Sequence, residues 1–322
     1  MRIGKITENA LKRSVLKLLR TEYKDVKSAA VGSDCAFSSN KEAFSAVSTV
    51  TADVSDPGFY AVMKAQTALF SQGITPDHVT VSIMLPADAE EKAVKDIVKG
   101  AISAAKMCDV PYAGGHTEVT DALNRALVTA TAVAGKSEGN LALSKPEAGE
   151  DLIITKWIAL EGTSMLAAER KENLSSRYPI PFIEEAERFK ELLDIRAEAA
   201  VAVESSVGAI HDISSGGIYA ALWEMSERAG CGLEVDLRKI PVRQETIEIC
   251  EFFEINPYQL LSGGALLLAA KDGESLVKKL EDKGIPAVVV GALKEGNDKI
   301  IINGEEKRYL ESPQADEIHK VL

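Results

Sequence analysis

The chain has 322 residues, of which 46% are hydrophobic and only 5% aromatic. This length allows one large or two ordinary domains, and the abundance of Ala and Val favours close-packed layers of helices and strands. The formal net charge of −12 argues against nucleic-acid binding through a basic face. No run of about 18 or more apolar residues is present, so we expect no membrane span.

The cysteines are too far apart for a CxxC pair, so neither a zinc nor a redox motif is indicated. They are Cys35, Cys108, Cys231 and Cys250. We expect free, buried thiols in a reducing compartment. The segment from Met1 to Lys5 runs directly into a charged helical pattern, which is unlike a signal peptide. These observations predict a cytoplasmic protein.

Hydrophobic periodicity predicts alternating helices and strands in the first half of the chain. The expected elements are a helix over 6–20, a strand over 44–53, a helix over 56–73, a strand over 79–85, a helix over 88–107 and a strand over 125–134. Asp56 followed by Pro57 is typical of a helix start. Asp88 and Glu91 match a capping box for the second long helix.

Residues 136–150 carry Gly, Ser, Pro and charges with little periodicity, which predicts a domain boundary. We therefore expect an N-terminal domain over 1–140 and a C-terminal domain over 150–322. The elements expected in the second half are a strand over 152–158, helices near 163–172, 181–194 and 217–229, a strand over 265–270, a helix from about 274, and strands over 287–293 and 299–302. Mixed strands and helices in two halves predict a two-domain α/β or α+β protein.

Four segments combine paired or single glycines with acidic or polar residues, each near the expected end of a strand or helix. They read Gly32-Ser33-Asp34, Ala113-Gly114-Gly115-His116-Thr117, His211-Asp212-Ile213-Ser214-Ser215-Gly216-Gly217 and Leu261-Ser262-Gly263-Gly264. Glycine lets backbone N–H groups approach an anion closely, and Asp can hold Mg²⁺ against phosphates. No Walker-type loop is present. The pattern predicts a nucleotide or phosphate site assembled from distant parts of the chain.

Taken in order, these motifs resemble the aminoimidazole ribonucleotide synthetase-like (PurM-like) superfamily, whose members bind ATP with Mg²⁺ and transfer its phosphoryl group. The nearest branch resembles the hydrogenase expression/formation protein HypE, of hydrogenase maturation. That likeness rests on Gly162–Ala168, Asp212–Ile218, Ile240–Arg243 and Glu254–Leu260. The resemblance implies an N-terminal domain that forms a β-barrel across a homodimer, and a C-terminal domain with a ferredoxin-like core.

The resemblance also implies roles for individual residues. Asp34 and Asp53 would hold Mg²⁺, and His116 and Asp212 are the candidate catalytic residues. The residues that would bind ATP are Lys5, Gly32, Asp34, Gly114, Gly115, Thr117, Gly216 and Gly217. In this interpretation His116 faces the acceptor, a small molecule.

Each of these residues also has a plainer interpretation. Asp34 is a common type of turn residue, and Asp53 at a strand end is commonly solvated. His116 fits equally as a polar residue in a glycine-rich loop. The residues before Gly217 suit simple capping of a helix, whether or not a ligand shares the site.

The chain also departs from the family pattern. Ser33 replaces the first acid of a Gly-Asp-Asp turn, and Thr67-Ala68 stand where relatives carry Asn-Asp. No cysteine follows Cys250, whereas HypE proteins end in a Cys-bearing tail. Three functions therefore remain open: ATP-dependent phosphoryl transfer to an oxygen of a small acceptor, a catalytically silent paralogue that binds a nucleotide or a partner, and a thiamine-monophosphate kinase.

Overall fold

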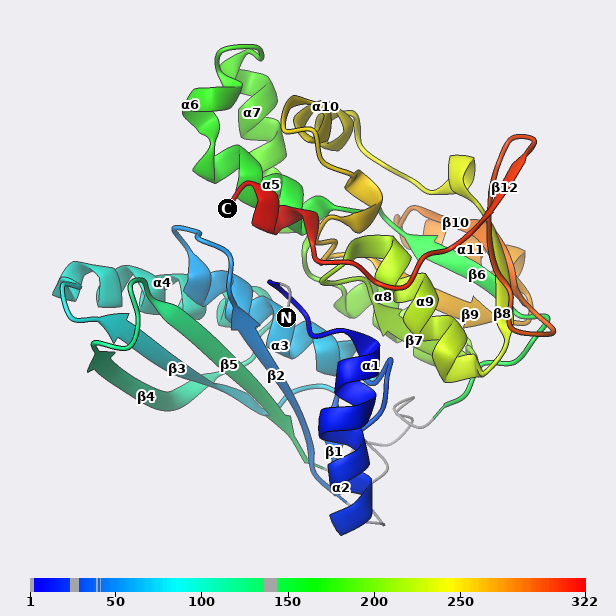
Figure 1. Ribbon diagram of the computed structural model, residues 1–322, viewed down its shortest axis with the longest axis horizontal. Helices are drawn as coiled ribbons and strands as arrows, with labels where there is room; N and C mark the ends of the chain where they lie inside the picture. Colours follow the sequence, from blue (N-terminus) through cyan, green and yellow to red (C-terminus); the bar gives the residue numbers. More distant parts are fainter. Residues whose placement is uncertain (1–2, 24–28, 39, 41, 136–143) are drawn as a thin grey trace.

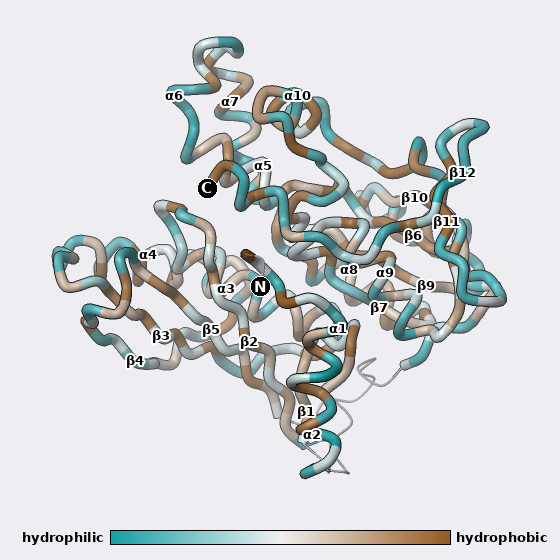
Figure 2. Tube along the Cα trace, viewed as in Figure 1, coloured by the Kyte–Doolittle hydropathy of each residue, from teal (hydrophilic) through white to brown (hydrophobic). Residues whose placement is uncertain are grey.

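The computed structural model describes residues 3–23, 29–38, 40, 42–135 and 144–322. Two α/β bodies follow one another along the chain, each built on one sheet (Figure 1). Hydrophobic residues concentrate along the central strands, whereas the outermost strand β12 (Glu306–Tyr309) is hydrophilic and exposed (Figure 2). No helix in the described ranges is long and apolar enough to cross a bilayer.

The N-terminal sheet has five strands in the order β1-β2-β5-β3-β4. Their bounds are β1 Ala36–Phe37, β2 Phe44–Val50, β5 Leu127–Ala134, β3 His78–Pro86 and β4 Tyr112–Thr120. Two helices, α3 (Pro57–Phe70) and α4 (Glu91–Met107), cover one face of this sheet (Figure 1). Alternate residues of β3 and β5 are buried beneath these helices, as period-two patterning dictates.

Strand β4 pairs with β3 in parallel and forms one edge of the N-terminal sheet. All of its residues from Ala113 to Val119 are exposed. Gly115 lies directly against the backbone of β3, because a Cβ there would be 1.8 Å from the Val81 carbonyl oxygen. The second glycine motif is therefore part of an open sheet edge.

A helical segment precedes the sheet and lies beside the C-terminal body (Figure 1). It runs without a break through α1 (Glu8–Leu11), a π-helical turn (Lys12–Leu16) and α2 (Lys17–Glu22). Trp223 donates a hydrogen bond from Nε1 to Glu8 at 2.7 Å. The start of the chain is thereby fixed against α9 (Gly217–Ala229).

The C-terminal sheet has seven strands in the order β12-β11-β8-β10-β6-β9-β7. The bounds not yet given are β6 Asp151–Thr155, β7 Ala209–Asp212, β8 Gly232–Asp236, β9 Leu266–Ala270, β10 Ala287–Lys294 and β11 Lys299–Asn303. Strands β9 and β10 flank β6, and α11 (Gly273–Glu281) connects them. This is the split β-α-β arrangement of ferredoxin-like folds.

The remaining helices surround this sheet or form a lobe above it (Figure 1). They are α5 Leu160–Glu169, α6 Lys171–Leu174, α7 Ile180–Glu187, α8 Arg196–Glu204 and α10 Gln244–Phe252. From β12 the chain returns across the molecule and ends near α5. This last segment brings residues 313–319 close to the N-terminal residues.

The two-domain α/β architecture is confirmed, as is Asp56 as the cap of α3, which accepts a hydrogen bond from the Phe59 N–H. The capping box at Asp88 is wrong, because α4 begins after Glu90 without a side-chain cap. The expected boundary falls partly on 136–143, outside the described residues, so domain limits of 1–140 and 150–322 stay predictions. The barrel across a homodimer also stays a prediction.

Candidate functional site

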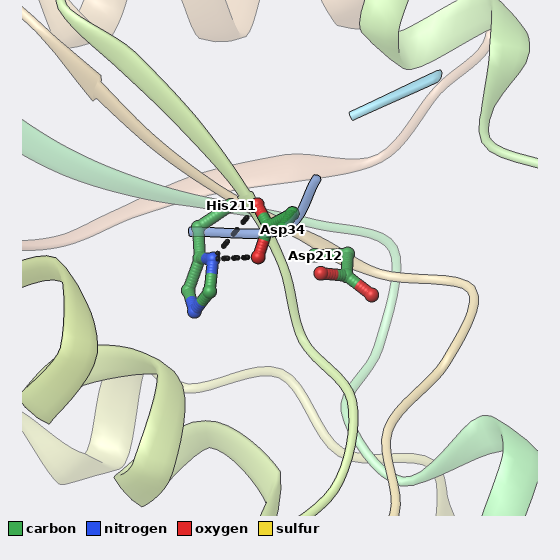
Figure 3. A group of neighbouring side chains, drawn as sticks. All are labelled: Asp34, His211 and Asp212. Carbon is green, nitrogen blue, oxygen red and sulfur yellow. Dashed lines mark hydrogen bonds and ion pairs between the residues drawn. The ribbon is translucent and has the colours of Figure 1, made fainter. Parts of the chain in front are cut away.

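Three titratable side chains from distant segments meet where β7 ends. Asp34 precedes β1, whereas His211 and Asp212 are the last two residues of β7. Ligand atoms of the three residues all lie within 4.8 Å of one another. Figure 3 shows the Asp34 carboxylate between the other two side chains. Two of the predicted site residues, Asp34 and Asp212, are thus brought together, as the distributed motifs required.

The imidazole of His211 is almost fully buried and joins two carboxylates. Nδ1 lies 2.8 Å from Asp34 Oδ1, and Nε2 lies 3.0 Å from Glu224 Oε2. Burial by itself lowers the pKa of His211, but the two acids outweigh it and raise that pKa to about 10. His211 therefore carries a positive charge at neutral pH, and with Lys5 it outweighs burial and lowers the pKa of Glu224 to about 2.

Whereas His211 favours its charged form, Asp212 favours its neutral form. Burial and the neighbouring Asp34 carboxylate raise the pKa of Asp212 to about 7. Asp212 therefore carries a proton part of the time near neutral pH, and a dication can take the place of that proton. The donor set fits Mg²⁺, which prefers one or two carboxylates together with phosphate and water oxygens. Both nitrogens of His211 are already engaged, so the carboxylates are the available ligands.

A polar relay holds Asp34 in position from the side of α3. Gln72 donates from Nε2 to Asp34 Oδ2 at 2.7 Å and to the Ile210 carbonyl oxygen at 3.1 Å. The Gln72 side chain therefore links the Asp34 carboxylate to β7.

Cys35, the residue after Asp34, is buried. Burial raises the pKa of its thiol to about 12, so Cys35 is a neutral packing group.

A cavity of about 570 Å³ lies on the far side of Glu224 and Lys5, and Asp34, His211 and Asp212 are not among its lining residues. Its walls come from the N-terminal segment, the exposed face of β2, the loop before α9 and the C-terminal segment; the lining includes Lys5, Val47, Thr49, Lys64, Arg125, Ser215, Gly216, Glu224, Asp316 and His319. The volume falls within the range of about 300–1,000 Å³ that ligand sites occupy. The lining holds three cations, Lys5, Lys64 and Arg125, and three acids, Glu8, Glu224 and Asp316. Lys5 is paired with Glu224, so Lys64 and Arg125 are the cations that could meet an anionic ligand.

Lys5 lies between the acidic cluster and the cavity. Its ammonium group forms an ion pair with Glu224. Burial lowers the pKa of Lys5, but Glu224, Asp34 and Asp212 together raise it above the ordinary value. Lys5 is therefore a fixed positive charge in the cavity wall. Lys5 was predicted to bind ATP, and its place in the lining of the cavity is compatible with that prediction.

The glycines near the cluster serve mainly for close packing. A Cβ on Gly32 would lie 2.8 Å from the Glu224 carbonyl oxygen, and one on Gly217 would lie 2.6 Å from that of Tyr258. Gly216 lines the cavity, and its N–H donates to Asp316 Oδ2 at 2.6 Å. Of these predicted ATP-binding glycines, only Gly216 faces the cavity.

The other predicted residues lie apart from the cluster within one chain. Gly114, Gly115 and Thr117 belong to the exposed edge strand β4 and do not line the cavity. His116 is 63% exposed and pairs with Glu118 at 2.9 Å. Asp53 is exposed in the loop between β2 and α3, outside the cavity lining. A single chain therefore assembles only part of the predicted set.

Several residues of the site were not selected from the sequence. His211 and His319 were not among the candidate site residues, yet His211 is central to the cluster and His319 lines the cavity. Glu224 lies seven residues after Gly217, two turns along the same helix, and this spacing is a usable signal. No local signal marks Gln72 or Lys64.

Comparison with known proteins gives family matches along most of the chain. Residues 15–136 match the family described as "AIR synthase related protein, N-terminal domain", and residues 147–303 match its C-terminal counterpart. A putative hydrogenase expression/formation protein of Methanocaldococcus jannaschii is 23% identical over 272 residues, which cover 83% of this chain and 79% of that protein. The carbamoyl dehydratase HypE of Rhodobacter capsulatus is 24% identical, covering 73% and 69% respectively. A selenide, water dikinase of Carboxydothermus hydrogenoformans is 26% identical, covering 77% and 79%.

Three solved structures have a similar fold. A HypE–HypF complex gives a TM-score of 0.74 at 19% identity and covers 93% of this chain and 100% of that chain. HypE in complex with ATP gives 0.69 at 16% identity, with 86% of each chain covered. ThiL complexed with AMPPCP and TMP gives 0.72 at 17% identity, covering 98% of this chain and 99% of that one. At these identities the likeness establishes the fold alone.

Proposed function

Because the chain belongs to the AIR synthase related protein family, we propose that it is an ATP-dependent enzyme that transfers a phosphoryl group to an oxygen of a small acceptor. The single observation that carries this proposal is the Asp34–His211–Asp212 cluster, whose neighbour Glu224 also lines the large cavity. ATP as the ligand is supported by the HypE and ThiL structures, which contain ATP and AMPPCP. The free cysteines are consistent with a reaction in the cytoplasm.

Asp34 and Asp212 would hold Mg²⁺, which would neutralise charge on the phosphates of the nucleotide. Asp212 is thereby a candidate catalytic residue. Its position in the cluster favours it over the exposed Asp53 as the second carboxylate. His211 places a positive charge 2.8 Å from Asp34, and Gln72 fixes the orientation of the Asp34 carboxylate.

Cationic side chains would bind the phosphates. Lys64 donates to Ser215 Oγ at 3.2 Å, and Arg125 is fixed by a hydrogen bond to the Thr51 carbonyl oxygen at 2.7 Å. Both line the cavity beside the start of α9, where the Gly216 N–H is already bonded to Asp316. Phosphoryl transfer depends mainly on such positioning and charge neutralisation.

A homodimer would complete the site. A second copy pairing along the exposed strand β4 would cover its glycine motif and place Gly114, Gly115 and Thr117 near the cavity of the partner. His116 would then face the acceptor. The open edge of β4 supports this arrangement, because an unpaired edge strand readily adds another strand.

The second candidate is a catalytically silent paralogue that binds a nucleotide or a partner without turnover. Ser33 and Ala68, which replace acids of the family pattern, favour it. Thiamine-monophosphate kinase is the third candidate. The fold of this chain agrees with the ThiL structure. However, Ala265-Leu266-Leu267 stand where thiamine-monophosphate kinases usually carry acids.

Calorimetry with Mg·ATP and a hydrolysis assay separate these candidates. We expect wild-type protein to bind and to hydrolyse Mg·ATP, and Asp34→Asn to lose at least about tenfold in affinity, since a charged ligand of the metal is lost. Asp96→Asn, an exposed change on α4, serves as the control. Binding without turnover would favour the silent paralogue, and turnover stimulated by thiamine monophosphate would favour the kinase. Absence of Mg·ATP binding would refute the proposal.

A further inference from the structure

His319 is a cavity residue whose ring has no hydrogen-bond partner. It belongs to the short 3₁₀ turn Glu317–Lys320 near the end of the chain. It lines both the main cavity of about 570 Å³ and a smaller neighbouring pocket of about 40 Å³. Its backbone N–H donates to the Asp316 carbonyl oxygen, but neither ring nitrogen forms a hydrogen bond with any described residue. Both nitrogens are therefore available to a ligand.

The ring of His319 lies against the N-terminal segment at the cavity wall. A Cβ on Gly4 would be 3.2 Å from Cδ2 of His319 and 3.4 Å from Nε2. Gly4 also belongs to the cavity lining, and the next residue, Lys5, is paired with Glu224. Because His319 is half-buried, a small molecule in the cavity can reach its imidazole.

The backbone on both sides of His319 is held in place. Asp316, three residues earlier, accepts hydrogen bonds from three backbone N–H groups, two of them in the loops before α9 and β9. Ile318 is buried, and Arg170 donates to the Val321 carbonyl oxygen at 2.6 Å. The imidazole is thus presented from a fixed segment, as a group that must meet one substrate atom requires.

The charges around His319 favour its neutral form. Burial and the positive charges of Arg125 and Lys64 lower the pKa of His319 below its ordinary value. The Asp316 carboxylate opposes this shift only in part, and both of its oxygens are engaged with backbone N–H groups. At neutral pH the ring is therefore an unprotonated imidazole that can accept a proton.

His319 lies beyond the two matched family segments, the second of which ends at residue 303. Of the four histidines, all of which the structure describes, it alone lines the cavity. His116, the histidine predicted to face the acceptor, is 63% exposed and pairs with Glu118. Within one chain, His319 is thus the imidazole placed to meet a ligand of the cavity.

We propose that His319 is the general base of the phosphoryl transfer and takes the proton of the acceptor hydroxyl. The inference rests on the proposed function, since it needs ATP and the acceptor in this cavity. The acceptor oxygen forms a bond to the γ-phosphorus while the bond from that phosphorus to the β,γ-bridging oxygen breaks. The electron pair of the broken bond leaves with ADP, and the hydroxyl proton moves to a ring nitrogen of His319.

Mg·ATP hydrolysis tests this step with water as the acceptor. His319→Gln and His319→Ala would be compared with the wild type. His78→Gln is the matched control, because His78 is a half-buried residue at the start of β3 that lines neither space. Turnover would be measured from about pH 5 to about pH 8, the range in which histidine titrates. Calorimetry on the same proteins would give the affinity for Mg·ATP.

Both His319 variants should lose about 100-fold or more in kcat, because proton transfer from the attacking water is no longer assisted. Their affinity for Mg·ATP should equal that of the wild type, since the carboxylates that would hold the metal are Asp34 and Asp212. Added imidazole should restore part of the rate to His319→Ala, in proportion to its neutral fraction. It should not restore His319→Gln, in which a side chain fills the space.

The same measurements separate this inference from the proposed function. Unchanged kcat in the His319 variants, a loss that imidazole does not rescue in His319→Ala, or weaker Mg·ATP binding that accounts for the loss would overturn the inference alone. Mg·ATP binding without turnover by the wild type would overturn it in favour of the silent paralogue. Absence of Mg·ATP binding by the wild type would overturn the proposed function, and the inference with it.

Discussion

His211 joins Asp34 to Glu224: its two ring nitrogens lie 2.8 Å from Asp34 Oδ1 and 3.0 Å from Glu224 Oε2. Asp34 belongs to the N-terminal body, whereas His211 and Glu224 belong to β7 and α9 of the C-terminal one. One buried imidazolium therefore connects the two bodies at the acidic cluster. Its charge state controls both the geometry and the electrostatics of the proposed metal site.

Replacing Glu224 by Gln should lower the pKa of His211 from about 10 toward its ordinary value, because one of two stabilising anions is removed. NMR titration of the imidazole in metal-free protein measures this change. Glu227→Gln is the matched control, since Glu227 lies on the same helix but pairs with Lys12 and Lys299. An unchanged His211 titration in Glu224→Gln would show that the contact with Glu224 is absent in solution.

Stability of the metal-free protein should fall as the pH rises from about 6.5 to about 10. The folded-state pKa of His211 lies above its unfolded value near 6.5, so its stabilisation is complete below about pH 6.5 and disappears as the pH passes the folded pKa. At about 1.4 kcal/mol per pKa unit, the loss is up to about 5 kcal/mol. Urea unfolding at several pH values, with a chelator present, tests this. His211→Asn should show a flatter profile over the same range.

Lys156 and Glu198 form a buried ion pair at 2.5 Å, and Lys156 also donates to the carbonyl oxygens of Leu192 and Asp194. Lys156→Met should destabilise the fold by about 3–5 kcal/mol, because Glu198 is left as an unpaired buried charge. The double variant Lys156→Met/Glu198→Leu should recover much of this loss. Denaturant unfolding provides the measurement, and equal instability of the single and double variants would contradict the explanation.

A dimer formed through β4 should depend on the exposed edge of that strand. Val119 is 60% exposed there, and Val119→Glu should convert the dimer to a monomer by placing like charges opposite each other across a symmetric interface. Ile180→Glu, at a 45% exposed position on α7, is the control and should leave the mass unchanged. Sedimentation velocity reports the outcome. A wild-type monomer at all concentrations would rule out the dimer.

Sequence periodicity predicted most of the helices and strands, because both long helices of the N-terminal body and strands β3 and β5 have regular apolar spacing. It missed β4, whose paired glycines and exposed residues interrupt the alternation, and the short strand β7. Asp34 and Asp212 were selected from separate motifs, and the structure brings them together. Gln72 and His319 were not found, since their roles depend on contacts with residues about 40 or more than 300 positions away.

Gly4 and His319, from opposite ends of the sequence, meet at the cavity, where a Cβ on Gly4 would lie 3.2 Å from the ring of His319. Asp316, a few residues earlier, ties down the loops at 216 and 261. A nascent polypeptide leaves the ribosome from its N-terminus, so this binding chamber is assembled only after residues 316–319 have been synthesised. Translational stalling before residue 316 would therefore release a folded N-terminal sheet without a complete ligand site.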